Sequence, residues 1–240
     1  MGLSIEDRFK DLIPGRLYYP YKIAKEMRRG EPELAILREL VPAGCTAIDV
    51  GANRGYYSYA LSKVAGRVEA FEPNPALARF ARRKLAANVR VHEVALTDHL
   101  GRAKFYLPQT TAGIDSHLVG NLHNLYPTLC NVEYDVAVAT VDSFDFDSVG
   151  FIKIDVEGGE LLVIKGALQT VARWKPNLLV ELLVAWHDAE AKIAEISSLL
   201  DYSASIVIDG RRVCARQALE QGRRATIKSY NVVFTPRPVG

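Results

Sequence analysis

Four acidic residues, Asp49, Glu72, Asp155 and Glu181, come at or near the ends of apolar segments that have the composition of buried strands. The first belongs to the run Asp49-Val50-Gly51-Ala52-Asn53-Arg54-Gly55, in which a strand breaks at two glycines and leads into an amphipathic segment. The amides at the start of a helix favour an anion, and a carboxylate can accept hydrogen bonds from ribose hydroxyls. These residue types in this order predict a pocket for a nucleotide-bearing cofactor.

The glycine spacing separates two classes of cofactor. A dinucleotide fingerprint requires G-x-G-x-x-G, and the middle glycine that admits a pyrophosphate is missing between Gly51 and Gly55. S-adenosylmethionine fits better, because its carboxylate could rest on the turn, its ammonium and sulfonium are favoured by Asp49, and its ribose could reach Glu72. A nicotinamide-dependent dehydrogenase is disfavoured but stays an alternative, as does a purely structural role for the glycines.

The elements that must position these residues alternate between strand and helix. Hydrophobic patterns predict strands at 46–50, 67–72, 89–96, 151–156 and 177–184, and helices at 33–40, 56–65, 75–87, 159–171 and 188–200. Alternation of this kind builds a mostly parallel sheet with helices on both faces, whose ligands bind beyond the carboxyl ends of the strands. Strands at 204–208 and 230–235 are expected to form an antiparallel pair at one edge. The simplest partition is one domain over residues 1–240.

The N-terminal part of the chain lies outside this alternation. Residues 1–30 are aromatic and basic and contain the cluster Tyr18-Tyr19-Pro20-Tyr21. We expect them to form an N-terminal cap. The tyrosines could close over the cofactor, line an acceptor groove or pack a helix against the sheet, and the sequence does not separate these roles.

A second irregular segment interrupts the middle of the chain. Half-exposed strands at 103–107 and 132–138 flank a long loop-rich stretch. Long excursions inside compact domains usually carry binding contacts, so the insertion at 106–135 is predicted to face the substrate. Its histidines, His117 and His123, are each ambiguous between a chemical role and a surface position.

The amino-acid composition argues against nucleic acid and membranes as binding partners. With 30 Lys and Arg against 28 Asp and Glu, the net charge of +2 gives no electrostatic case for nucleic acid or an anionic membrane. Neither a membrane-spanning apolar stretch nor a secretory leader is apparent. Cys45, Cys130 and Cys214 show no CxxC or metal-binding spacing. The expected setting is cytoplasmic, with a small-molecule or glycosidic acceptor as the partner.

Several stretches together resemble the FkbM family of S-adenosylmethionine-dependent methyltransferases. They are residues 49–58, 71–75, 94–98, 116–118, 140–144 and 151–160. Their order and spacing agree from about residue 31 to residue 185, and the run Lys153-Ile154-Asp155-Val156-Glu157-Gly158 is the most specific. The resemblance implies a Rossmann-like class I methyltransferase fold with a seven-stranded, mostly parallel sheet and an antiparallel C-terminal edge hairpin. It also implies an acceptor hydroxyl on a sugar, lipid or secondary metabolite.

Carried over position by position, the resemblance implies which residues contact the cofactor. The expected set is Asp49, Gly51, Ala52, Asn53, Gly55, Tyr56, Glu72, Pro73, Asn74, Ala95, Thr97, Asp98 and Asp155. Within it, Thr97 and Asp98 would lie near the adenine. Gly159 stands where the family often has a larger residue, commonly histidine, which would alter the substrate side of the pocket. The tail after Ala185 matches poorly.

Methyl transfer from a sulfonium needs a nucleophile held in line about 3 Å away and, for a hydroxyl, a group that removes its proton. Asp155 and Glu181 are expected to end adjacent strands and to flank the accepting oxygen, with Asp155 favoured as the base. His187, after the fifth strand, is the third catalytic candidate. Two carboxylates could also bind a divalent cation, so metal dependence is left open although no metal site is predicted. Alternatively, Asp155, Glu157 and Glu160 only cap the following helix and complement its charge.

The sequence therefore predicts an S-adenosylmethionine-dependent methyltransferase that releases S-adenosylhomocysteine (SAH), with O-methylation favoured. The accepting atom is not determined, so an N- or carboxyl-directed methyltransferase is one alternative. A partner protein that binds the cofactor without turnover is another. The oligomeric state is also open, because the N-terminal segment and the final hairpin could each cover a second copy or the chain's own sheet.

Overall fold

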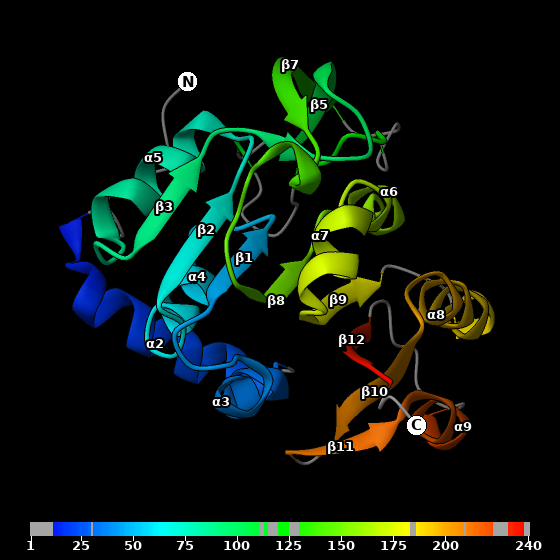
Figure 1. Cartoon of the computed structure of the whole chain (residues 1–240). Helices are drawn as coiled ribbons and strands as arrows, with labels where there is room; N and C mark the ends of the chain where they lie inside the picture. The colour runs from blue at the N-terminus through cyan, green and yellow to red at the C-terminus, as the bar shows by residue number, and fades with distance from the viewer. Residues whose placement is uncertain are drawn as a thin grey trace.

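The fold is described from a computed structural model of the chain, which covers residues 12–29, 31–110, 113–114, 120–124, 130–182, 186–208, 210–222 and 230–237. The main sheet has eight strands: β1 (Thr46–Val50), β2 (Arg67–Phe71), β3 (Val89–His92), β8 (Val149–Ile154), β9 (Asn177–Leu182), β10 (Tyr202–Ile208), β11 (Arg211–Cys214) and β12 (Tyr230–Pro236). Their spatial order is β11-β10-β12-β9-β8-β1-β2-β3 (Figure 1).

Five strands, from β9 across to β3, pair in parallel. Every residue of β1 is buried, including Asp49, which explains why the strand does not alternate between apolar and exposed polar residues. The chain proceeds from β1 to β2 and β3 on one side, and β8 and β9 lie on the other side. The order therefore reverses beside β1, and the carboxyl end of β1 is the point at which such sheets bind ligands.

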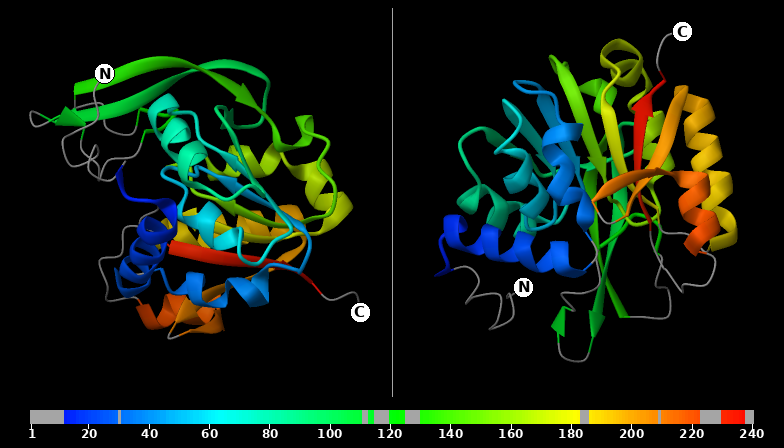
Figure 2. Two further views of the ribbon diagram at one scale, coloured as in Figure 1. Left: turned by 90° about the vertical axis from the view of Figure 1, so that its left-hand side faces the viewer. Right: turned by 90° about the horizontal axis from the view of Figure 1, so that it is seen from below.

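Helices cover both faces of the sheet (Figure 2). One face carries η1 (Pro32–Ile36), α3 (Leu37–Leu40) and α4 (Tyr56–Leu61), with α2 (Gly15–Arg29) packed on α4, and α5 (Pro75–Lys84) contacts β3. The other face carries α6 (Glu160–Lys165), α7 (Leu168–Trp174), α8 (Trp186–Leu200) and α9 (Ala215–Gly222). Successive β1 residues Ala47 and Ile48 pack into the two separate cores, as the alternation of a strand requires. Within the described ranges, no helix is long and apolar enough to cross a bilayer.

The prediction of a single strand at 89–96 is wrong. The chain instead leaves the main sheet after β3 and forms β4 (Ala95–Leu96), which pairs with a second sheet of order β4-β7-β5-β6. The other members are β5 (Gly101–Thr110), β6 (Gly113–Ile114) and β7 (Cys130–Ala139), followed by η2 (Val141–Ser143). The strands expected at 103–107 and 132–138 are confirmed but longer, because β5 and β7 pair antiparallel from Gly101 with Val138 to Gln109 with Cys130, at the carboxyl side of the main sheet (Figure 1).

The main sheet has eight strands rather than the expected seven, and the expected antiparallel C-terminal edge is confirmed, with 204–208 pairing with 230–235 as β10 and β12. β12 lies between β9 and β10, antiparallel to both, and the added strand β11 forms the edge. Burial explains this order. Val232, Val233 and Phe234 are fully buried, which requires neighbours on both sides, whereas Arg211 and Arg212 are exposed, as is usual for an edge strand.

Candidate functional site

The glycine turn after β1 is held by close backbone packing. Gly51 has a φ of 79°, and a Cβ there would lie 1.8 Å from the carbonyl oxygen of Asp155, so only glycine fits. The amides of Gly51 and Ala52 both donate to the carbonyl of Phe71, and the Gly55 amide donates to the carbonyl of Ala52. The turn therefore joins the ends of β1, β2 and β8.

Glu72, directly after β2, has a buried carboxylate. Its Oε2 accepts a hydrogen bond from the Asn53 amide and its Oε1 accepts one from the Asn74 amide, both at 2.8 Å. Burial raises the pKa of Glu72 to about 7, against the lowering effect of these two amides. Asn74 in turn caps α5 by accepting from the Ala76 amide at 3.0 Å, and Pro75 occupies the first helical position as predicted. Each carboxylate oxygen keeps a lone pair for a ligand hydroxyl.

A buried charge cluster lies at the ends of β1 and β8. Lys153 Nζ is 2.9 Å from Asp155 Oδ2 and 4.6 Å from the ring centroid of Tyr57. Burial by itself lowers the pKa of Lys153, but the carboxylates of Asp155 and Asp49 outweigh it and hold the pKa above its usual range. Asp49 is fully buried, and burial raises its pKa. Ser58 donates to Asp49 Oδ2 at 2.5 Å, whereas Asp49 Oδ1 has no partner among the described residues.

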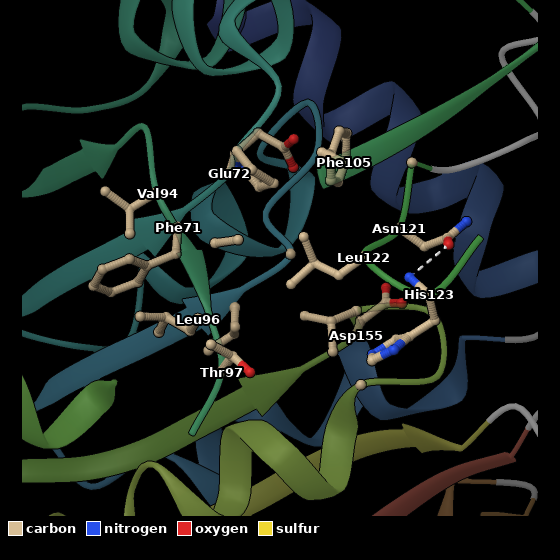
Figure 3. Close-up of a pocket in the computed structure, with 17 residues that line it drawn as sticks. Phe71, Glu72, Val94, Leu96, Thr97, Phe105, Asn121, Leu122, His123 and Asp155 are labelled. Atoms are coloured by element: carbon tan, nitrogen blue, oxygen red, sulfur yellow. Dashed lines mark hydrogen bonds between the residues drawn. The ribbon is translucent and has the colours of Figure 1, made fainter. Parts of the chain in front are cut away.

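One pocket opens between these strand ends and the second sheet (Figure 3). Its lining residues are Val50, Gly51, Phe71, Glu72, Pro73, Val94, Ala95, Leu96, Thr97, Phe105, Gly120, Asn121, Leu122, His123, Asp155, Val156 and Gly159. Phe71, Val94 and Leu96 form an apolar end, and Asp155 and His123 form a polar end on the opposite side (Figure 3). Such a pocket suits a ligand with a flat apolar part and a charged part.

The pocket gathers only part of the predicted set. Gly51, Glu72, Pro73, Ala95, Thr97 and Asp155 line it directly. Asp49, Ala52, Asn53, Gly55 and Asn74 lie behind it in the turn and cap just described. Two others point elsewhere: Tyr56 donates to Glu31 Oε1 at 3.2 Å, and exposed Asp98 accepts from His99 at 2.8 Å.

The three catalytic candidates are placed unequally. β8 and β9 are neighbours, as expected, and Ile154 pairs with Val180, so Asp155 and Glu181 follow paired residues at the same edge. Glu181 is partly buried and does not line the pocket. His187 lies in α8, with its side chain outside the described part of the structure, as is all of His117.

Sequence reasoning missed four residues that support this edge, Lys153, Tyr57, Glu31 and Asn231. Lys153 belongs to the family motif, and a lysine inside an apolar strand is itself a signal of a buried charge partner. Tyr57 was not singled out, and its hydroxyl donates to Glu31 Oε2 at 2.6 Å. The Asn231 amide donates to the same oxygen at 3.1 Å, which ties β12 to the N-terminal segment. No local pattern marks Glu31 or Asn231, because their contacts join distant parts of the chain.

The space beside Gly159 is occupied. The resemblance predicted that glycine here would alter the substrate side of the pocket. A Cβ at Gly159 would lie 3.0 Å from His123 Nε2, so the imidazole of the insertion fills the place that a side chain at 159 would take. His123 is itself fixed by its amide, which donates to Asn121 Oδ1 at 3.1 Å (Figure 3).

The N-terminal tyrosines have different roles. Tyr18 packs edge-on against Phe80, and Tyr21 is exposed. Tyr19 is fully buried, stacks on Tyr59, and donates from its hydroxyl to the Arg54 carbonyl at 2.9 Å. Packing against the fold is thus the role of Tyr18 and Tyr19, and Tyr19 also fixes the glycine turn.

Replacing Tyr19 by phenylalanine is expected to weaken SAH binding about threefold to tenfold and to lower stability by about 1 kcal/mol, because one buried hydrogen bond to the turn is lost. Calorimetry and urea unfolding measure the two effects. The matched control is Tyr21→Phe, at an exposed hydroxyl, which should change neither. Equal behaviour of the two variants would show that α2 does not support the turn.

Three carboxyl groups predict how stability varies with pH. Burial raises the pKa of Glu33, Glu72 and Glu157 from 4.5 to about 7. Between these values the folded protein binds more protons than the unfolded chain, so stability is present at low pH and is lost as the pH rises through 7. Without cofactor, the urea midpoint should therefore fall from pH 5.5 to 7.5, and Glu157→Gln should reduce the slope. A midpoint that rises over this range would contradict the assignment.

Comparison with known proteins gives a consistent result. The sequence profile described as the methyltransferase FkbM domain matches residues 49–205. A search of curated protein sequences finds no relative. Methyltransferase FkbM of Methylobacillus flagellatus KT aligns with a TM-score of 0.52 at 18% identity, over 80% of this chain and 43% of that chain. This chain thus spans less than half the length of that protein.

Two further structures align with TM-scores below 0.5. Precorrin-6y C5,15-methyltransferase of Geobacter metallireducens GS-15 aligns with a TM-score of 0.48 at 14% identity, over 86% of this chain and 87% of that chain. SMU.1697c of Streptococcus mutans, a structure in complex with SAH, aligns with a TM-score of 0.46 at 12% identity, over 85% of this chain and 96% of that chain. At these identities the structural likeness concerns the fold alone. The profile match covers most of the chain, including the glycine turn, Glu72 and the stretch from Lys153 to Glu160. The chain belongs to the FkbM family of S-adenosylmethionine-dependent methyltransferases.

Proposed function

We propose that this protein binds S-adenosylmethionine in the pocket described above and methylates a hydroxyl oxygen of a sugar, glycolipid or secondary metabolite. The observation that carries the proposal is the placement of Glu72 between an apolar end and a polar end of one pocket. Phe71 and Leu96 offer flat apolar contacts to an adenine, and the carboxylate of Glu72 can accept from both ribose hydroxyls.

The residues present fit the charged part of the same ligand. The buried Asp49 Oδ1, which has no partner among the described residues, could accept from an ammonium group. Gly51 lines the pocket, and its lack of a side chain lets the turn pack against the backbone of Asp155. When bound, the cofactor would supply a methyl group on a sulfonium, which would face the carboxylate of Asp155 at the polar end.

An acceptor would approach from the polar end. Asp155 lines the pocket there, and its carboxylate can accept a hydrogen bond from the reacting hydroxyl and so orient its oxygen. Glu181, on the neighbouring strand and outside the lining, stays a proposed second carboxylate. The Lys153 ammonium already neutralises much of the charge on Asp155, which suits a positioning role better than proton removal. His187 stays a proposed catalytic residue on the strength of its place in the chain.

The same proposal covers the arrangement of the chain. Residues 1–240 act as one methyltransferase domain, with 1–30 as a cap and the insertion at 106–135 facing the acceptor. Its described residues Gly120, Leu122 and His123 line the pocket, which supports this assignment. Among the described residues there is no group of three His, Cys, Asp or Glu side chains placed to hold a metal ion. A cytoplasmic setting and a small-molecule acceptor complete the proposal.

Calorimetry with SAH tests the cofactor, and transfer of an isotope-labelled methyl group into a panel of glycosides, glycolipids, phenols, amines and carboxylic acids tests the acceptor. We expect SAH to bind and the label to enter hydroxyl-bearing compounds, with mass spectrometry locating it on oxygen. Absence of SAH binding would overturn the cofactor assignment. Label on nitrogen or a carboxylate would replace O-methylation by the N- or carboxyl-directed alternative. Binding without transfer to any class would favour a non-catalytic partner.

A further inference from the structure

The side chain of His123 occupies an unusual position for a residue of an insertion. Its imidazole lies against the backbone of Gly159, at the start of α6, with Nε2 3.0 Å from where a Cβ would stand. The Val156 side chain lies 3.4 Å from the same point and borders the space that the imidazole occupies. Glycine at 159 is therefore what permits an imidazole from the insertion, between β6 and β7, to enter the pocket.

The surroundings of this imidazole are those of the reacting end rather than the adenine end. Figure 3 shows His123 beside Asp155 and across the pocket from Phe71, Val94 and Leu96. His123 is exposed at the mouth of the pocket, so it can exchange protons with solvent. The other titratable groups among the described lining residues are Asp155 and Glu72, and Asp155 is already paired with Lys153.

We infer that His123 is the catalytic base of the methyl transfer and that Gly159, by lacking a side chain, leaves room for its imidazole; this inference rests on the proposed function. The accepting oxygen gains the methyl carbon and gives its proton to the free nitrogen of the imidazole. The electron pair of the broken carbon–sulfur bond stays on sulfur. The imidazolium formed then releases the proton to solvent at the mouth, which restores the neutral ring.

Nuclear magnetic resonance of the histidine rings tests the position of the base without turnover. The resonance of His123 is assigned by its loss in His123→Gln, and its titration is compared with SAH and with sinefungin, which carries an ammonium at the position of the transferred methyl. A like charge nearby disfavours the imidazolium, so the midpoint should be lower with sinefungin by about 0.5–1 pH unit. The exposed ring of His99, paired with Asp98, is the internal control and should not shift.

Two variants test the role of His123 as base and the position of its imidazole against Gly159. His123→Ala should lower labelled methyl transfer into the panel by ~100-fold or more, which is the usual scale of base catalysis, while SAH binding and the unfolding midpoint change little. Adding Gly159→His to this variant places an imidazole at the same spot from the other side and should restore at least about tenfold, which a merely structural role would not do.

The outcomes separate the two proposals. If SAH and sinefungin bind but the His123 midpoints agree, or if His123→Ala keeps full transfer, His123 is not the base although the cofactor assignment stands. If neither ligand binds by calorimetry, the proposed function fails and this inference fails with it.

Discussion

Replacement of Glu72 by alanine is expected to weaken SAH binding by ~100-fold or more, because two hydrogen bonds to a charged group contribute about 1.5–3 kcal/mol each. The carboxylate is buried and already oriented by the amides of Asn53 and Asn74, so it needs no reorganisation to accept the ribose hydroxyls. Calorimetry of the wild type and the variant measures the loss.

Two variants control this experiment. Glu72→Gln keeps one acceptor oxygen, so its affinity should fall between those of the wild type and the alanine variant. Glu93→Ala removes a half-exposed acid whose partner is Arg82 on the outer side of β3, and it should leave SAH binding unchanged. If Glu72→Ala binds SAH with wild-type affinity, the ribose does not contact Glu72 and the assignment of the cofactor to this pocket is wrong.

The same residue predicts a pH dependence for the cofactor. Since burial raises the pKa of Glu72 to about 7 in the cofactor-free protein, part of the population is protonated at neutral pH. The protonated form has lost one acceptor oxygen, so SAH affinity should rise as the pH increases from 6 to 8. In Glu72→Gln this rise should be reduced.

Replacement of Lys153 by methionine is expected to lower the free energy of unfolding by about 3–5 kcal/mol, because removing one partner leaves buried carboxylates without a compensating charge. Lys153 is 4% exposed, and both Asp155 and the fully buried Asp49 raise its pKa. Methionine has a similar volume and keeps the contact with the ring of Tyr57, so the loss measures charge rather than packing. Urea unfolding at pH 7.5 provides the measurement.

An exposed ion pair of the same kind serves as the control. Lys104 and Asp135 lie 3.2 Å apart with side chains 52% and 58% exposed, so Lys104→Met should cost about 0–1 kcal/mol. Adding Asp155→Asn to Lys153→Met should recover part of the loss. The difference in free energy of unfolding between Lys153→Met and the wild type should also become smaller at low pH, because burial raises the pKa of Asp49 and protonation removes its charge. A loss below about 1 kcal/mol in Lys153→Met would mean that water screens this cluster as it screens a surface pair.

The parts of the site that the sequence predicts are those held by local geometry. The turn at Gly51, the cap formed by Asn74 with Pro75, and the adjacency of β8 and β9 all follow from residue types at short spacing or from the usual order of parallel strands. Glycine at a positive φ and proline at the start of a helix have few alternatives, so short stretches of sequence are sufficient.

Other features depended on pairing between distant segments. Periodicity shows that residues 89–96 are extended, but it does not show that β4 leaves β3 for a second sheet. It likewise shows that 230–235 is a strand, whereas its central place follows from burial of Val232 and Val233 between β9 and β10. A period reports which face of an element is apolar, and the partner that covers the face is decided by the whole fold.

The sequence by itself determined the cofactor class and the family, because both depend on short motifs from Asp49 to Gly55 and from Lys153 to Glu160. Only the tertiary structure decided which side chains share the pocket. It moved Asp98 outward, joined Tyr19 to the glycine turn, and placed His123 of the insertion against Gly159. The physical reason is that a catalytic pocket is formed by side chains from separate strands and loops, and their convergence is set by sheet order and packing rather than by neighbours in sequence.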